Sequence, residues 1–197
     1  MTLCEGLGFL VPVAGLAGAT VLGLPPVAAW LLAVCCGAGE GAMLGLGQST
    51  AMGGSRAEVN RRRWILATAT AAAVAWGIGM LPSTLSDIGV DIDWTAPLTW
   101  IGAGSAALVL LATIPVAQWP LLRERVPRAW RWIPLNMGAW CVGLVFTFLP
   151  GSFVDEHTPA AVMALAFALA GVCMAATVAA VTGLGLARMM RTPTASA

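Results

Sequence analysis

Six apolar stretches, each long enough to cross a lipid bilayer as a helix, constrain the fold of this chain more than any other feature. The hydrocarbon core of a bilayer is about 30 Å thick and requires roughly 20 mostly apolar residues in a helix. Pro, Gly and charged residues between the stretches place six helices at approximately residues 7–24, 27–52, 64–81, 98–122, 130–149 and 159–186. We therefore predict an all-α integral membrane protein, with residues 1–197 forming a single transmembrane domain.

The composition agrees with lipid as part of the solvent. Hydrophobic residues make up 59% of the 197 residues and charged residues only 10%, which is more apolar surface than a soluble domain of this size can bury. All ten positive charges are Arg, and Ala and Gly are abundant, a bias typical of a GC-rich genome that we interpret as bacterial. Because these Arg residues are divided among short loops, no basic face exists, and nucleic acid is not expected as a partner.

The distribution of charge predicts the orientation in the membrane. All ten Arg residues lie in or beside alternate loops, namely Arg56, Arg61, Arg62, Arg63, Arg123, Arg125, Arg128, Arg131, Arg188 and Arg191. The intervening loops carry acids alone, namely Asp87, Asp91, Asp93, Asp155 and Glu156. Short cytoplasmic loops are enriched in positive charge. We therefore expect a multi-pass protein of the cell (inner) membrane with both termini in the cytoplasm and the acidic loops outside.

The chain also resembles itself at an offset of about 70 residues. Trp30 precedes Gln48 by 18 residues, and Trp100 precedes Gln118 by the same interval. Each Gln is followed by an Arg-bearing loop, a Trp that opens the next helix, and a Leu-Pro pair with an acid beyond it. The repeat units span approximately residues 27–87 and 97–155. Since both units start outside, the repeat is parallel, with its axis along the membrane normal.

A third unit is one extension of this repeat. The Leu-Pro pairs at Leu24, Leu81 and Leu149 are each expected to end a helix that runs outward. The sixth and first helices would then form a circularly split third hairpin, which completes a six-helix bundle of hairpins. The alternative is that membrane helices rich in Ala and Gly resemble one another through composition alone.

One segment resembles a known sequence pattern. The stretch AQWPLLRERVPRAWRWIPLNMGAW, residues 117–140, contains Gln118 and Trp119 near a helix end, then Leu121 and Arg123, then a second helix led by Trp. It is similar to small uncharacterised multi-pass bacterial membrane proteins with a Gln-Trp-x-Leu-x-Arg pattern at a helix end. A weaker echo runs over residues 45–80, where Ser49 stands in place of the Trp. The resemblance implies a fold and no activity.

Glu40 is the strongest candidate for a functional residue. It lies about 13 residues, or roughly 20 Å at 1.5 Å per residue, from either end of its predicted helix. A carboxylate at that depth is costly unless it is protonated, paired or beside a wet cavity, so an intramembrane acid suggests a functional site. Gly37, Gly41 and Gly45 recur at four-residue spacing beside it and permit another helix backbone to approach closely. Glu40 is thus either an ion site or a hydrogen-bonding anchor in helix packing.

Three amides are candidate interfacial or interhelical polar groups. Gln48 and Gln118 occupy equivalent places near the cytoplasmic ends of their helices, where they can bond to headgroups, loop backbone or each other. Asn136 lies inside the fifth helix, where its amide can bond across helices for about 1 kcal/mol. We expect all three to be structural. The Trp residues near the helix ends, including Trp64 and Trp132, are expected to form an aromatic belt at the interface.

Other sites receive weaker support. Pro115 and Pro134 are expected to interrupt the fourth and fifth helices and to free backbone groups there. Asp87, Asp91 and Asp93 could attract a divalent cation, although a solvated loop is the simpler interpretation. Four of the five Cys lie in apolar runs, so neither a structural disulfide nor a metal site is expected.

These observations favour a protein that is not an enzyme. The sequence contains no recognisable nucleophile elbow, metalloprotease motif or phosphate-binding loop, so no catalytic residue and no cofactor is predicted. The leading hypothesis is a subunit or scaffold that docks a partner membrane protein, or a second copy of itself, through glycine-lined faces. The alternative is a small proton- or cation-coupled transporter or channel that uses Glu40.

Overall fold

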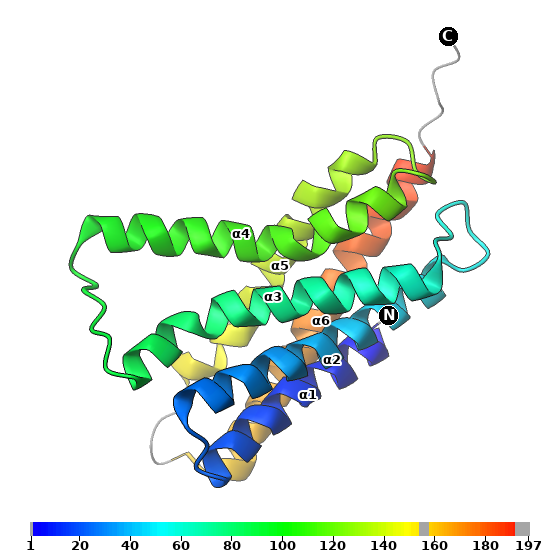
Figure 1. Ribbon diagram of the computed structural model, residues 1–197. Helices are drawn as coiled ribbons and strands as arrows, with labels where there is room; N and C mark the ends of the chain where they lie inside the picture. The colour runs from blue at the N-terminus through cyan, green and yellow to red at the C-terminus, as the bar shows by residue number, and fades with distance from the viewer. Residues whose placement is uncertain (1, 154–157, 192–197) are drawn as a thin grey trace.

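The computed structural model describes residues 2–153 and 158–191, and within these ranges every regular element is helical (Figure 1). The α-helices are α1 (Thr2–Val21), α2 (Pro26–Met52), α3 (Arg61–Asp87), α4 (Pro97–Leu122), α5 (Trp132–Phe148) and α6 (Ala160–Arg191), with short 3₁₀ turns η1 (Ala129–Arg131) and η2 (Pro150–Ser152). The prediction of an all-α chain is confirmed. Five segments, containing α2 to α6, are long and apolar enough to cross a membrane, so the chain is a multi-pass membrane protein.

Local sequence explains several helix ends. Pro26 and Pro97 each begin a helix, because a first-turn residue has no intrahelical partner for an N–H and proline already has a helical φ. The side chain of Asn60 accepts a hydrogen bond from the Arg63 backbone N–H at 3.0 Å and so caps α3. Gly89, at φ +85°, follows the end of α3 in a conformation that suits glycine.

The structure corrects several predicted boundaries. The first helix covers residues 2–21 and not 7–24, and the sixth continues to Arg191. Pro82 does not end α3, which runs on to Asp87. The hydroxyls of Ser83 and Thr84 both donate to the Met80 carbonyl, at 2.9 and 2.8 Å, in the same turn of the helix as Pro82.

The two prolines predicted to interrupt helices differ in their effect. Pro115 does lie inside α4, together with Pro120. Pro134 does not interrupt α5, because this helix begins at Trp132 and a proline in the first turn displaces no intrahelical hydrogen bond. A functional site at a broken fifth helix is therefore not supported.

The helices pack as antiparallel neighbours. The most extensive contact is between α2 and α3, followed by α1 with α2 and α5 with α6. Helix α4 contacts α3 and α5, and α1 also contacts α6. The N-terminal half of α4 extends away from the other helices (Figure 1). Residues 98–109 are exposed there almost without exception, so this segment has few neighbours within the chain.

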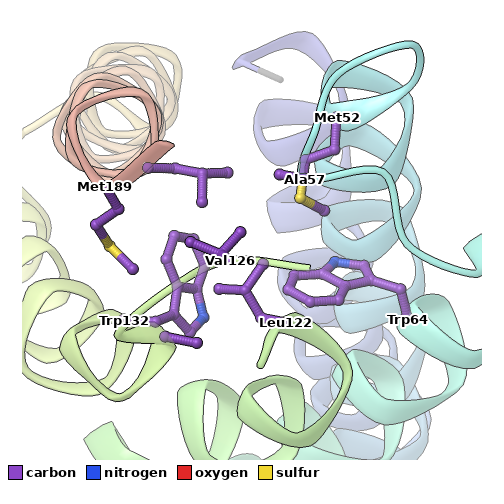
Figure 2. Close-up of a cluster of buried hydrophobic side chains, with 9 residues drawn as sticks. Met52, Ala57, Trp64, Leu122, Val126, Trp132 and Met189 are labelled. Carbon is purple, nitrogen blue, oxygen red and sulfur yellow. The ribbon is translucent and has the colours of Figure 1, made fainter. Parts of the chain in front are cut away.

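The three arginine-bearing segments lie together at one end of the helices, on the right in Figure 1. We call this the arginine end and the opposite one the acidic end. At the arginine end lies a cluster of buried apolar side chains (Figure 2), composed of Met52, Ala57, Trp64, Leu122, Val126, Ala129, Trp132, Leu186 and Met189. The predicted acidic loop around Asp155 and Glu156 lies outside the described residues.

Candidate functional site

A buried polar network lies directly beside the apolar cluster of the arginine end. The Gln118 side-chain N–H group donates to Gln48 Oε1 at 2.7 Å and to the Thr68 hydroxyl at 2.9 Å. The indole of Trp64 donates to Gln48 Oε1 at 3.1 Å, and that of Trp132 donates to Gln118 Oε1 at 2.9 Å. These five residues, the glutamine network, therefore tie α2, α3, α4 and α5 together.

Each member of this network is shielded from the surroundings. Gln118 and Thr68 are fully buried and Gln48 is 3% exposed. The two glutamine amides therefore lie inside the protein and do not face headgroups. The sequence placed Trp64 and Trp132 in an aromatic belt, but both are buried and their rings meet at 6.3 Å between centroids. That expectation was wrong, because each indole packs inward to give its N–H to a glutamine.

The glycines beside Glu40 line the contact between α2 and α3. A Cβ at Gly37 would overlap the indole of Trp76. A Cβ at Gly41 would lie 2.5 Å from Ala72 Cβ, and one at Gly45 would lie 2.9 Å from the Ile65 backbone. The glycine face is therefore occupied by α3 of the same chain, which leaves it unavailable as a docking surface for a partner.

Glu40 points toward α3 and a cavity. Its Oε2 accepts a hydrogen bond of 2.7 Å from the indole N–H of Trp76. The cavity has a volume of about 490 Å³ and is only partly enclosed. Helices α2, α3, α4, α5 and α6 all contribute to its wall, which consists of Glu40, Gly41, Leu44, Ala72, Ala75, Trp76, Gly79, Met80, Leu110, Leu111, Ile114, Trp140, Leu144, Thr147, Phe148, Met174, Ala175 and Val178.

Glu40 is the one ionisable side chain among the described residues that line this cavity. The hydroxyl of Thr147 also lies there, and it donates to Met174 Sδ at 3.1 Å. The remaining wall is formed by aliphatic, aromatic and methionine side chains. A mostly apolar cavity of a few hundred Å³ with one or two polar groups has the usual character of a small-molecule site.

Asn136 is buried apart from these groups. Its side chain is fully buried, and neither its Oδ1 nor its Nδ2 has a hydrogen-bond partner in the described part of the chain. Thr182 on the adjacent α6 is also fully buried and donates to the Val178 carbonyl at 2.6 Å. The structure thus places Asn136 inside the protein, while the glutamine network forms without it.

At the acidic end, Asp93 holds a turn of the loop between α3 and α4. The Asp93 carboxylate accepts hydrogen bonds from the Thr95 hydroxyl at 2.6 Å and from the Thr95 backbone N–H at 2.8 Å. These bonds hold the pKa of Asp93 below its usual value, because they favour the charged form. Within the described residues, no group of three or more His, Cys, Asp or Glu side chains is arranged to hold a metal ion.

Sequence reasoning singled out Glu40 but missed its partners. Trp76 and the cavity wall were not identified, because nothing in a single sequence shows which face of an apolar helix turns inward. Thr68, Trp64 and Trp132 were also missed as polar partners. The only available signal was that a Trp follows each Gln after a similar interval, 16 residues for Gln48 and 14 for Gln118.

Comparisons with known proteins do not add to this description. No protein-family model, no curated protein and no solved structure matches the chain.

Proposed function

We propose that this chain is a small proton- or cation-coupled membrane transporter, with Glu40 as the group that holds the proton or cation. The observation that carries the proposal is that the Glu40 carboxyl group lines a cavity among helices that cross the membrane. An acid in such a place is costly, and acids that remain there commonly mark ion or substrate pathways. The proposal assigns no catalytic residue and no cofactor to the chain.

A parallel repeat of helix hairpins supports the same proposal. We infer that α2–α3 and α4–α5 are the two units, because Gln48 and Gln118, 70 residues apart, bond to each other and each accepts an indole N–H. Four residues after each of these indoles come Thr68 and Asn136, both buried. Related units around a central cavity are a recurring plan of transporters.

The orientation belongs to the proposal as well. We propose that the arginine end faces the cytoplasm of a bacterial cell and the acidic end faces outward, because positive charge is retained on the cytoplasmic side. Both termini are then cytoplasmic. The Arg side chains would also contact anionic lipid headgroups.

Proton flux into vesicles tests the role of Glu40. The full chain is reconstituted into liposomes with a trapped pH-sensitive dye, and a membrane potential is imposed. We expect the wild-type chain to conduct protons above the rate of empty liposomes and Glu40→Gln to return the rate to that background. A wild-type rate equal to that of empty liposomes, or one unchanged by Glu40→Gln, contradicts a proton pathway through Glu40.

A matched pair of substitutions on α3 tests the role of the cavity. Ala75→Phe adds bulk to the cavity wall, whereas Val74→Phe adds it at a neighbouring position that is 50% exposed on the helix surface. We expect Ala75→Phe to reduce the flux severalfold and Val74→Phe to leave it unchanged. Equal effects of the two substitutions would show that the cavity does not carry the flux.

A second candidate function is a subunit or scaffold of a membrane complex. The N-terminal half of α4 favours it, since Gly102 and Gly104 have nothing within 4 Å of an added Cβ and Leu98 is 77% exposed. Small residues on a lipid-facing helix permit close approach of another helix. Mass spectrometry of the assembly, extracted intact from its native membrane, distinguishes the two candidate functions. A stoichiometric partner supports a subunit of a complex. Recovery of the chain alone, or as a homo-oligomer, favours the transporter.

A further inference from the structure

The cavity beside Glu40 combines a single carboxyl group with a wall that is otherwise almost wholly apolar. Its volume of about 490 Å³ falls within the range of sites for small organic molecules, roughly 300 to 1,000 Å³. A ligand that fills it must therefore present a mostly apolar surface. It must also form a hydrogen bond or an ion pair with the Glu40 carboxyl group.

No positive side chain lies near this carboxyl group among the described residues that line the cavity. The first Arg after Glu40 along the chain is Arg56, which lies beyond the end of α2 at Met52, and Met52 is itself about 18 Å from Glu40 at 1.5 Å per residue. Within the described part of the chain, the Glu40 carboxylate accepts its hydrogen bond from the neutral indole N–H of Trp76. A carboxylate in an apolar site is strongly stabilised by a ligand that brings a positive charge.

The wall is unsuited to a bare metal ion. Ca²⁺, for example, takes six to eight oxygen ligands and Mg²⁺ is octahedral, whereas the cavity offers side-chain oxygens from Glu40 and Thr147 only. The surrounding backbone carbonyls belong to helices and bond within them, apart from that of Leu111, whose usual donor in α4 would be the N–H that Pro115 lacks. Oxygens from these three residues are still too few for either ion. A cation bound here must therefore bring its own apolar shell.

The rest of the wall supplies surfaces that suit such a shell. Trp76, Trp140 and Phe148 are aromatic residues of the wall, and Met80 and Met174 are its methionines. Aromatic faces attract organic cations, and methionine side chains adapt to irregular apolar shapes.

We propose that the cavity binds a monovalent organic cation with an apolar body, such as a substituted ammonium or phosphonium ion, with its charge at Glu40. This inference rests on the proposed function and names the class of ligand. The charged centre lies beside the carboxylate and the Trp76 indole. The apolar body extends along α4, α5 and α6.

Equilibrium dialysis of the detergent-purified full chain tests the proposal with two probes of the same shape. One is 4-phenylbutyl-trimethylammonium, and the other is its neutral isostere in which carbon replaces the charged nitrogen. We expect the wild-type chain to bind the cation about tenfold or more tightly than the isostere, as attraction to a desolvated carboxylate and an aromatic face predicts. Protein-free micelles are dialysed in parallel to subtract partitioning of each probe.

Four variants locate the preference. Glu40→Gln removes the charge but keeps an acceptor for Trp76, so the preference for the cation should disappear. Glu40→Asp retains the charge and should retain the preference, which controls for loss of the native fold. Asp91→Asn removes one negative charge from the exposed loop at the acidic end and should leave the preference unchanged. Ala75→Phe should weaken the binding of both probes.

The possible outcomes separate this inference from the proposed function. A preference that survives Glu40→Gln, or equal binding of the two probes, overturns the assignment of an organic cation. If equal binding is abolished by Ala75→Phe, the cavity remains a binding site and the transporter proposal stands. If neither probe binds the wild-type chain, the cation assignment fails, and the flux through Glu40→Gln vesicles then decides separately whether the transporter proposal fails with it.

Discussion

At the scale of single residues, the glutamine network has the clearest energetic consequence. The Gln118 side chain forms three hydrogen bonds of this network, with Gln48, Thr68 and Trp132. Replacing it by Leu leaves the buried Trp132 N–H without an acceptor, and an unsatisfied buried polar group costs about 1–3 kcal/mol. We expect Gln118→Leu to lower the free energy of unfolding by about that amount, measured by titration with SDS and followed by circular dichroism.

A double-mutant cycle attributes this loss to the hydrogen bond. Trp132→Phe removes the indole N–H together with the need for an acceptor. In the Gln118→Leu background its additional cost should therefore be smaller than in the wild-type background, by about 1 kcal/mol. Strict additivity of the two substitutions would indicate that the bond contributes nothing.

Asn136 should respond in the opposite direction. Its buried amide has no partner in the described part of the chain, so Asn136→Leu removes an unsatisfied group without breaking a hydrogen bond. We expect the free energy of unfolding to stay the same or to increase by about 1 kcal/mol. A large decrease in the same SDS titration would mean that the amide is bonded in the folded protein, for example to a buried water molecule.

At the scale of helices, the pair α2–α3 depends on the absence of side chains. An added Cβ at Gly41 would lie 2.8 Å from the Thr68 carbonyl oxygen as well as 2.5 Å from Ala72 Cβ. Since both neighbours are themselves held by packing, Gly41→Ala should force the helices apart and cost about 1–3 kcal/mol. Gly104→Ala on α4 is the matched control, because nothing lies within 4 Å of its added Cβ.

The control substitution Gly104→Ala has its own expected effect on the free energy of unfolding. Alanine is a better helix former than glycine by up to about 1 kcal/mol, so Gly104→Ala should be neutral or slightly stabilising. If both substitutions cost the same, close approach of α2 and α3 would not be the reason for the glycines. Gly143 and Gly185 make a comparable contact between α5 and α6, which the four-residue spacing did not reveal because it occurs on α2 alone.

At the scale of the whole molecule, the orientation is directly testable. In a background without native cysteines, Glu124→Cys introduces a thiol at the arginine end and Val90→Cys introduces one at the acidic end, and both positions are exposed. A maleimide that cannot cross membranes should label position 90 in intact cells and position 124 only after the cells are opened. Labelling of position 124 in intact cells would reverse the orientation proposed here.

The chain length and hydropathy of the apolar runs were enough to predict an all-helical membrane protein. In lipid, the backbone N–H and C=O groups of an apolar segment must form hydrogen bonds within the protein, and a helix forms them within the segment itself. Helix formation therefore depends on local sequence and can be predicted from it. The same holds for Glu40, which was recognised by depth alone, and for the ten Arg residues, whose distribution along the chain already separates two ends. Errors arose where a local rule was too strict, as at Pro82, which lies inside α3 although it lacks the N–H that an interior helix residue donates.

Rotation of each helix about its axis was decided only by tertiary packing. The helices are apolar on nearly every side, so no periodic pattern shows which face of α3 turns Trp76 toward Glu40 or which indoles leave the interface to meet Gln48 and Gln118. The fit of glycines on α2 against α3 fixes that rotation. The sequence by itself thus determined the apolar helices and the acid within one of them. Only close packing between helices determined the glutamine network, the cavity and the partner of the acid.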